Sequence, residues 1–330
     1  MRALRVVAAT VGIALLSGCG PKPGGGGHSA SGLVTLRLAY FPNVTHGVAL
    51  VGAGRGDFAK ALGPGVKIEE QTFNAGPAEI EALFADQVDL GYVGPGPAIN
   101  GFLKSKGRAL RIIAGAASGG ASLVVRADSG IADIMGLANR RVAVPQTGGT
   151  QDISLRHALQ TAGLGATDKG GSVTVLPTPN PDALTLFKKK EIDAAWVPEP
   201  WVARLVKEGG GRILIDERDL WPGKRFATTV VIVRTRFLDE HPDIVARFIS
   251  AHTNTVGWIR TNPDDARRVI GEQIKMDTSK AIPDDILKDA LSRTEFTQDP
   301  LKESVLTFAD WAKGLGYQRE GRSALGSLYR

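Results

Sequence analysis

Two similar stretches recur in the sequence, and their spacing is the strongest constraint on how the chain can fold. Each contains a Leu-Phe pair, then a short apolar run that includes an Asp, then an aromatic residue followed by Val, and finally a turn rich in proline. The stretches are residues 83–97 and 186–200. They lie about a hundred residues apart, whereas a solenoid repeat spans about 20 to 50 residues. We therefore expect two similar α/β lobes.

Strand and helix patterns alternate along most of the chain. Strands are expected at residues 34–41, 66–73, 88–93, 110–116, 122–126, 142–144, 173–176, 192–197, 212–215 and 228–233. From Pro242 onward the pattern is helical, at residues 244–249, 256–259, 283–291 and 301–315. Strands that alternate with helices predict largely parallel sheets, whose ligands bind beyond the carboxyl ends of the strands. Equivalent loops of the two lobes would then face one shared cleft.

The stretch at residues 140–155 has the clearest pattern for binding an anion. A short apolar strand at residues 142–144 is followed by Gly148 and Gly149, and Thr150 is a plausible N-cap for the next helix. A helix N-terminus presents free backbone N–H groups and the positive end of the helix dipole. Many such turns in α/β proteins bind nothing, so this pattern alone does not define a site.

Five loops marked by glycine or proline follow strands and precede helices. They are residues 41–47, 74–77, 94–97, 147–151 and 196–201. If their helix N-termini converge, backbone N–H and hydroxyl groups could hold a small oxyanion. These loops supply His46, Asn74 and Gln151 as candidate ligand-binding residues. His46 could donate a hydrogen bond to an anion, or it could simply be a solvated loop residue.

The loop at residues 196–201 contains two tryptophans on either side of a carboxylate. Trp196 and Trp201 could form aromatic walls around the apolar part of a ligand, or they could pack in the core. Glu199 would repel an anion unless it meets a cationic group or points away. It could equally be an exposed residue in the first turn of a helix, stabilised by the helix dipole.

Motifs of common enzyme classes are missing from the sequence. No Gly-Lys-Ser/Thr phosphate loop is present, and no serine lies in a nucleophile elbow. The five histidines lack the close spacing of metal ligands. We therefore expect no catalytic residue, metal or cofactor. The alternative is a secreted enzyme that uses His46 and Glu199 as an acid–base pair on an anionic substrate.

The N-terminal residues have the pattern of an exported lipoprotein. A basic segment with Arg2 and Arg5 precedes an apolar run at residues 6–16, which is too short to span a membrane. The only cysteine, Cys19, ends a Leu-Ser-Gly-Cys sequence that matches the bacterial lipobox, in which the cysteine is lipidated. Residues 20–32, rich in Gly, Pro and Ser, would form a flexible tether. A lone cysteine also excludes an intramolecular disulfide and a cysteine-based metal site.

The length and net charge of the chain limit the kinds of molecule that it is expected to bind. The chain has 330 residues, enough for two domains, and a formal net charge of +6, with positive and negative residues interspersed. A mild basic excess favours small anions or a membrane surface and gives little reason to expect nucleic-acid binding.

Several of these motifs together resemble the solute-binding proteins of ABC importers for aliphatic sulfonates, taurine and nitrate. The resemblance spans nearly the whole mature chain in order. It is carried by the lipobox and by the segments at residues 40–42, 73–77, 88–97, 141–151, 192–201 and 241–243. It implies a periplasmic-binding-protein type II fold with two lobes, two crossover segments near residues 117–122 and 224–229, and a return to the first lobe for the C-terminal helices.

The resemblance further implies a division of the chain and a set of site residues. Residues 1–18 would be the signal peptide, 19–32 the lipidated tether, 33–120 and 226–330 the first lobe, and 121–225 the second. The ligand-binding positions implied by the family motifs are Pro42, Asn43, Gly94, Pro95, Gly148, Thr150, Trp196 and Glu199. The pair of tryptophans favours a sulfonate over nitrate, and Glu199 would suit an amine-bearing sulfonate such as taurine.

The implied mechanism is closure of the lobes on the ligand and delivery to a membrane permease driven by separate ATPase subunits. We expect a monomeric protein outside the cytoplasm, held at the membrane by the lipid on Cys19. The cysteine-rich motif of the related pyrimidine synthases is absent, which excludes that branch of the family.

Overall fold

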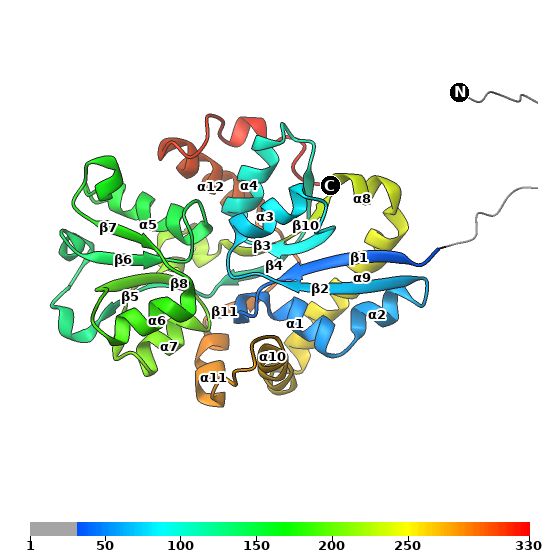
Figure 1. Cartoon of the computed structure of the whole chain (residues 1–330), viewed down its shortest axis with the longest axis horizontal. Coiled ribbons are helices and arrows are strands. Elements are labelled where there is room, and N and C mark those ends of the chain that lie inside the picture. Colours follow the sequence, from blue (N-terminus) through cyan, green and yellow to red (C-terminus); the bar gives the residue numbers. More distant parts are fainter. Residues whose placement is uncertain (1–31) are drawn as a thin grey trace, which may run out of the picture. The chain divides into compact units, whose positions relative to one another are not determined.

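The computed structural model describes residues 32–330, and residues 33–330 form one compact unit. Cys19 and most of the predicted tether therefore lie outside the described residues. The unit contains two β-sheets with helices on both faces of each (Figure 1). Both the α/β class and the two-lobed fold predicted from the sequence are confirmed.

The first sheet has six strands in the order β11-β4-β10-β3-β1-β2. β1 pairs in parallel with β2 and β3, whereas β10 is antiparallel to β3 and β4, and β11 is antiparallel to β4. The strands are β1 (Val34–Tyr40), β2 (Val66–Thr72), β3 (Leu90–Val93), β4 (Leu110–Gly119), β10 (Ala227–Arg234) and β11 (Thr294–Phe296).

The second sheet has five strands in the order β7-β6-β8-β5-β9. β6 pairs in parallel with β7 and β8, whereas β5 is antiparallel to β8 and β9. The strands are β5 (Ala121–Arg126), β6 (Arg141–Val144), β7 (Thr174–Pro177), β8 (Ala194–Pro198) and β9 (Gly211–Asp216). The expectation of largely parallel sheets was wrong: the first sheet has two parallel and three antiparallel strand pairs, and the second has two of each. The antiparallel strands lie next to the crossings between the sheets.

Helices cover both faces of each sheet because the strands bury apolar side chains on both sides. In β1, Leu36 and Leu38 pack on one face and Ala39 on the other, as the two-residue period of a strand requires. The first face is covered by α1 (Gly47–Gly54), α2 (Asp57–Leu62), α8 (Thr235–Glu240), α9 (Pro242–Thr261), α10 (Pro263–Thr278) and α11 (Asp284–Ser292), and the second by α3 (Gly76–Phe84), α4 (Pro95–Lys104) and α12 (Lys302–Gly314). α5 (Thr150–Thr161) packs on one face of the second sheet, and α6 (Asn180–Lys188) with α7 (Trp201–Lys207) on the other.

The chain passes between the sheets at two places that fit the predicted crossovers. The first is Gly119-Gly120, between β4 and β5, where both residues have a positive φ of 72° and 70°. A Cβ on Gly120 would lie 2.5 Å from Thr294 Oγ1, so this turn requires glycine for its space as well as its conformation. The second crossing lies between Asp216 at the end of β9 and Ala227 at the start of β10. The lobe boundaries given above remain a prediction.

Three local expectations were wrong. The small residues after Ala116 continue β4 to Gly119 instead of forming a loop, because they pair with β10 and β11. The two helical segments expected at residues 244–259 form a single helix, α9. Thr150 is the first residue of α5 and not its N-cap, which is Gly149. Within residues 32–330, no helix is both long and apolar enough to cross a membrane.

Candidate functional site

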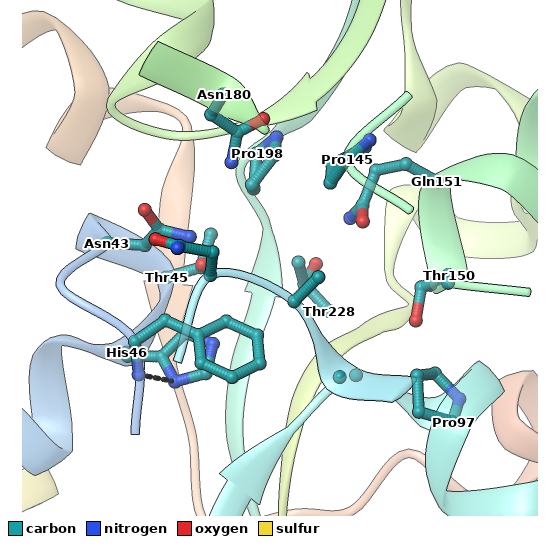
Figure 2. Close-up of a pocket in the computed structure, with 16 residues that line it drawn as sticks. Asn43, Thr45, His46, Pro97, Pro145, Thr150, Gln151, Asn180, Pro198 and Thr228 are labelled. Carbon is teal, nitrogen blue, oxygen red and sulfur yellow. Dashed lines mark hydrogen bonds between the residues drawn. The ribbon is translucent and has the colours of Figure 1, made fainter. Parts of the chain in front are cut away.

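A small cavity of about 30 Å³ lies where the loops after the parallel strands of both sheets meet (Figure 2). The loops after β1, β2 and β3 contribute from the first sheet, and those after β6 and β7 from the second. The lining residues are Phe41, Asn43, Thr45, His46, Asn74, Ala75, Gly76, Gly94, Pro97, Pro145, Gly149, Thr150, Gln151, Asn180, Pro198 and Thr228. The site thus lies beyond the carboxyl ends of parallel strands, where α/β proteins bind ligands.

Four helices begin at this cavity. α3 follows its N-cap Ala75, α4 follows Gly94, α5 follows Gly149, and α6 begins at Asn180. No side chain caps the N-terminus of any of the four in the described part of the chain. Free backbone N–H groups of the first turns are the donors that bind anions at helix N-termini. Two of these helices belong to each sheet, so an anion here would be held from both sides.

The side chains around the cavity are neutral hydrogen-bonding groups. The sixteen residues include no Asp, Glu, Lys or Arg. Four carboxamides (Asn43, Asn74, Gln151 and Asn180) and three hydroxyls (Thr45, Thr150 and Thr228) line it beside His46. Neutral donors suit an anion that is always ionised and needs no proton from the protein.

His46 is buried in its neutral form. Burial lowers the pKa of its imidazole to about 3, and its ring stacks on Phe41 with 4.2 Å between the ring centroids. The backbone N–H of Phe41 donates to Nδ1 at 3.2 Å, which leaves the proton of the neutral ring on Nε2 (Figure 2). His46 can therefore act as a hydrogen-bond donor without carrying a positive charge.

Among the residues that line the cavity, Asn180 has a buried polar atom without a hydrogen-bond partner in the described part of the chain. Its side chain is buried, and its Oδ1 has no hydrogen-bond partner within residues 32–330. A buried polar atom without a partner costs free energy, about 1–3 kcal/mol. A ligand that donates a hydrogen bond to Oδ1 would remove this cost. If the Asn180 amide is rotated by 180°, its NH₂ group takes this position and donates to a ligand instead.

Thr150 joins the two lobes at the edge of the cavity. Its Oγ1 accepts a hydrogen bond from the backbone N–H of Gly96 at 3.3 Å. α4 and the start of α5 approach so closely that a Cβ on Gly94 would lie 2.2 Å from Thr150 Oγ1. Because the hydroxyl accepts from Gly96 and does not cap α5, its own hydrogen is free to point at a ligand.

Six of the residues predicted from the sequence line the cavity: Asn43, His46, Asn74, Gly94, Thr150 and Gln151. Pro42 lines a larger cavity next to it. Pro95 is buried in the first turn of α4 and is not among the lining residues. Gly148 also lies outside the lining, and its N–H donates to Asp152 Oδ2 at 2.8 Å. That bond shapes the loop between β6 and α5.

Trp196 and Glu199 do not reach the cavity, and their predicted placement is corrected. Trp196 is fully buried among the residues packed under α5, and its Nε1–H donates to Glu217 Oε2 at 2.7 Å. Glu199 is 1% exposed and accepts from Arg293 Nε at 2.6 Å and from the N–H of Ala203 at 3.1 Å. The two side chains thus stabilise the core and a junction of helices.

Several lining residues were not predicted. Thr45 and Asn180 lie in loops that the sequence marks by proline, but neither residue type by itself indicates binding. Thr228 lies near the start of β10, an antiparallel strand that enters the site only through long-range pairing with β4. No local sequence pattern indicates Thr228.

A larger cavity of about 470 Å³ adjoins the first and shares Asn43, Asn74 and Asn180 with it. Trp201 is part of its wall, and its Nε1–H donates to Asn43 Oδ1 at 3.0 Å. Of the two tryptophans, Trp201 lines a cavity, and its role as an aromatic wall around a ligand remains a prediction. Trp201 lines this larger cavity and not the small one.

Side-chain contacts connect the two lobes in two places, each close in sequence to a loop that lines the small cavity. In the first place, the hydroxyl of Tyr317 donates to Asp152, whose carboxylate also accepts from the N–H of Gly148. Nearby, the ring of His157 stacks on that of Trp311, with 3.9 Å between the ring centroids. In the second place, the ion pair between Arg293 and Glu199 connects the end of α11 to the start of α7. Movement of one lobe against the other would therefore change the shape of the small cavity, whose lining comes from both lobes.

Comparison with known proteins gives relatives that cover most of the chain. A protein of Bacillus subtilis (strain 168), named for binding aliphatic sulfonates, is 29% identical over 305 residues, which is 91% of this chain and 86% of that protein. The taurine-binding periplasmic protein of Escherichia coli (strain K12) is 26% identical over 207 residues, 63% of this chain and 61% of that protein.

Solved structures share the fold. The alkanesulfonate-binding protein SsuA of Xanthomonas axonopodis pv. citri, bound to MOPS, superposes with a TM-score of 0.73 at 20% identity and covers 89% of this chain and 96% of that one. The periplasmic nitrate-binding protein NrtA of Synechocystis PCC 6803 gives a TM-score of 0.72 at 15% identity, with 88% and 84% covered. The model of the NMT1-like family matches residues 29–274, and the chain therefore belongs to the NMT1-like family.

Proposed function

We propose that this protein is the substrate-binding component of an ABC importer and that it captures small organosulfonates between its two lobes. The observation that carries the proposal is the small cavity of neutral donors at four helix N-termini, two from each sheet. A sulfonate head has three oxygens that only accept hydrogen bonds, and this cavity offers donors from several directions. The names of the Bacillus and Xanthomonas proteins support the same ligand class.

The proposed mechanism is closure on the ligand followed by delivery. An anion that bridges donors of both lobes stabilises the closed arrangement, which a membrane permease with its ATPase subunits would then recognise. The name of the taurine-binding periplasmic protein supports a location outside the cytoplasm. We further propose that the protein is held at the membrane by a lipid on Cys19 and acts as a monomer.

The same scaffold could bind taurine, nitrate or another small anion. Taurine is favoured by Asn180, because an ammonium group would supply the donor that its buried Oδ1 lacks. Nitrate would fit the small cavity alone, but it would leave the adjoining large cavity unused. The enzyme alternative loses its proposed acid–base pair, because Glu199 faces Arg293 and not His46.

Calorimetric titration of the purified protein with ethanesulfonate, taurine and nitrate tests the proposal. We expect saturable binding of at least one sulfonate, stronger than the binding of nitrate. Incubation of the bound sulfonate should return it chemically unchanged. Heat from nitrate alone would overturn the sulfonate proposal, and conversion of the ligand would overturn the assignment as a binding protein.

Replacing Thr150 by valine tests the site itself. Valine has a similar shape but removes the hydroxyl, so the ligand loses a charge-assisted hydrogen bond and the N–H of Gly96 loses its acceptor. We expect sulfonate binding to weaken by about 1 to 3 kcal/mol. Thr150→Ser is the matched control, since it keeps the hydroxyl and should bind nearly as the unmodified protein does. Equal affinities of the Val and Ser variants would remove Thr150 from the site.

A further inference from the structure

The cavity of about 470 Å³ next to the small one, called the outer cavity below, could hold the part of a ligand that lies beyond its head group. It adjoins the small cavity and shares three carboxamide residues with it. The small cavity, at about 30 Å³, has room for a head group only, whereas the outer one has about 470 Å³. Any ligand larger than its head group must therefore extend into the outer cavity.

Eight of the seventeen residues that line the outer cavity are apolar, and they come from both lobes. Leu184 and Trp201 contribute from α6 and α7, and Phe73, Ile274 and Ile282 contribute from the first lobe. Apolar walls of this kind favour the hydrocarbon body of a ligand, aromatic or aliphatic.

The charged groups at the outer cavity leave an excess of positive charge. Arg204 is neutralised by Glu208, with Nε to Oε1 at 2.8 Å and Nη2 to Oε2 at 3.1 Å, and its guanidinium lies over the Trp201 ring. Lys188 and Lys280 also line the cavity, and neither makes an ion pair within residues 32–330. Lys188 ends α6 in the second lobe, and Lys280 follows α10 in the first.

Lys188 and Lys280 come from opposite lobes and line the same cavity, so their ammonium groups repel each other when the lobes close and attract an anionic group placed between them. We propose that the outer cavity is a subsite for the far end of a larger organosulfonate, one with an apolar body and a second anionic group such as a carboxylate. This inference rests on the proposed function, in which the sulfonate head occupies the small cavity.

Three probes separate the two parts of the site. Ethanesulfonate reports on the head cavity, benzenesulfonate adds an apolar body, and 4-sulfobenzoate adds the second anion. At low salt we expect the full-length protein to bind 4-sulfobenzoate about tenfold tighter than benzenesulfonate, the sum of two exposed charge interactions. The preference should fall as sodium chloride is raised, because both lysines are exposed.

The double variant Lys188→Gln/Lys280→Gln keeps the alkyl stems and removes both charges. It should lose the preference for 4-sulfobenzoate and bind ethanesulfonate as before. Lys189→Gln is the matched control, because Lys189 is an exposed neighbour that does not line the cavity. If ethanesulfonate binds but the two aromatic sulfonates bind equally well, the second subsite is overturned and the proposed function stands. If none of the three binds, both are overturned.

Discussion

Replacing Arg293 by alanine should lower the free energy of unfolding by about 3–5 kcal/mol, because it leaves a buried carboxylate without its partner. Glu199 is 1% exposed, and Arg293 Nε lies 2.6 Å from its Oε1. Urea denaturation at pH 8 measures the loss. Lys207→Ala is the matched control, since the Lys207–Asp285 pair joins the same helices, α7 and α11, but both side chains are substantially exposed. We expect Lys207→Ala to cost less than about 1 kcal/mol.

The pH dependence of this loss identifies its cause. Burial raises the pKa of Glu199, and Arg293 opposes that rise. Without Arg293 the pKa of the folded state rises further above that of the unfolded state, so the carboxyl takes up a proton on folding. The stability of the variant is then highest at low pH and declines as the pH rises through the folded-state pKa. A second substitution, Glu199→Gln, should restore much of the stability at pH 8. A loss that is equal at pH 5 and pH 8 would contradict this account.

Glu217 should make the stability of the unmodified protein depend on pH in the neutral range. This residue is fully buried in a short 3₁₀ helix (Glu217–Leu220), where Ser154 Oγ donates to it at 2.6 Å and Trp196 Nε1 at 2.7 Å. Burial raises the pKa of its carboxyl to about 7, although the two hydrogen bonds oppose the rise. The folded state therefore binds the proton more tightly than the unfolded state does.

The contribution of Glu217 to stability is complete below the pKa of an ordinary glutamate and is lost as the pH rises through about 7. The total loss is about 3 kcal/mol, the free energy that corresponds to the pKa shift. Glu217→Gln should remove this part of the pH dependence, because the amide can accept from Trp196 and donate to Ser154 without a charge. Urea midpoints from pH 4.5 to pH 8 measure both curves. Parallel curves for the two proteins would contradict the prediction.

The sequence predicted the lobes and most strands because these depend on local patterns. The apolar alternation before Pro42 and the glycines before Thr150 each determine a strand end and a helix start with little help from the rest of the chain. The continuation of β4 to Gly119 and the short strand β11 were missed because they depend on pairing partners more than a hundred residues away.

The candidate site was predicted in part, for a similar reason. Residues in the loops that begin α4 and α5 line the cavity, because a helix start beyond a parallel strand faces the ligand side. Trp196 was misplaced because β8 is buried on both faces: Trp196 packs in the core on one face, and Ala195 and Val197 pack in the core on the other. Glu199 finds its partner in Arg293, ninety-four residues later, and no local pattern connects the two.

The absence of formal charge among the residues around the small cavity has a consequence for unloading. An anionic ligand bound to an arginine or lysine would keep its ion pair with one lobe after the lobes separated, and its dissociation would require that ion pair to break. Here the lining side chains carry no formal charge and come from both lobes, so separation of the lobes would move the donors of one lobe away from a bound ligand and let water take their place. Separation of the lobes by the transporter would then be enough to release the ligand.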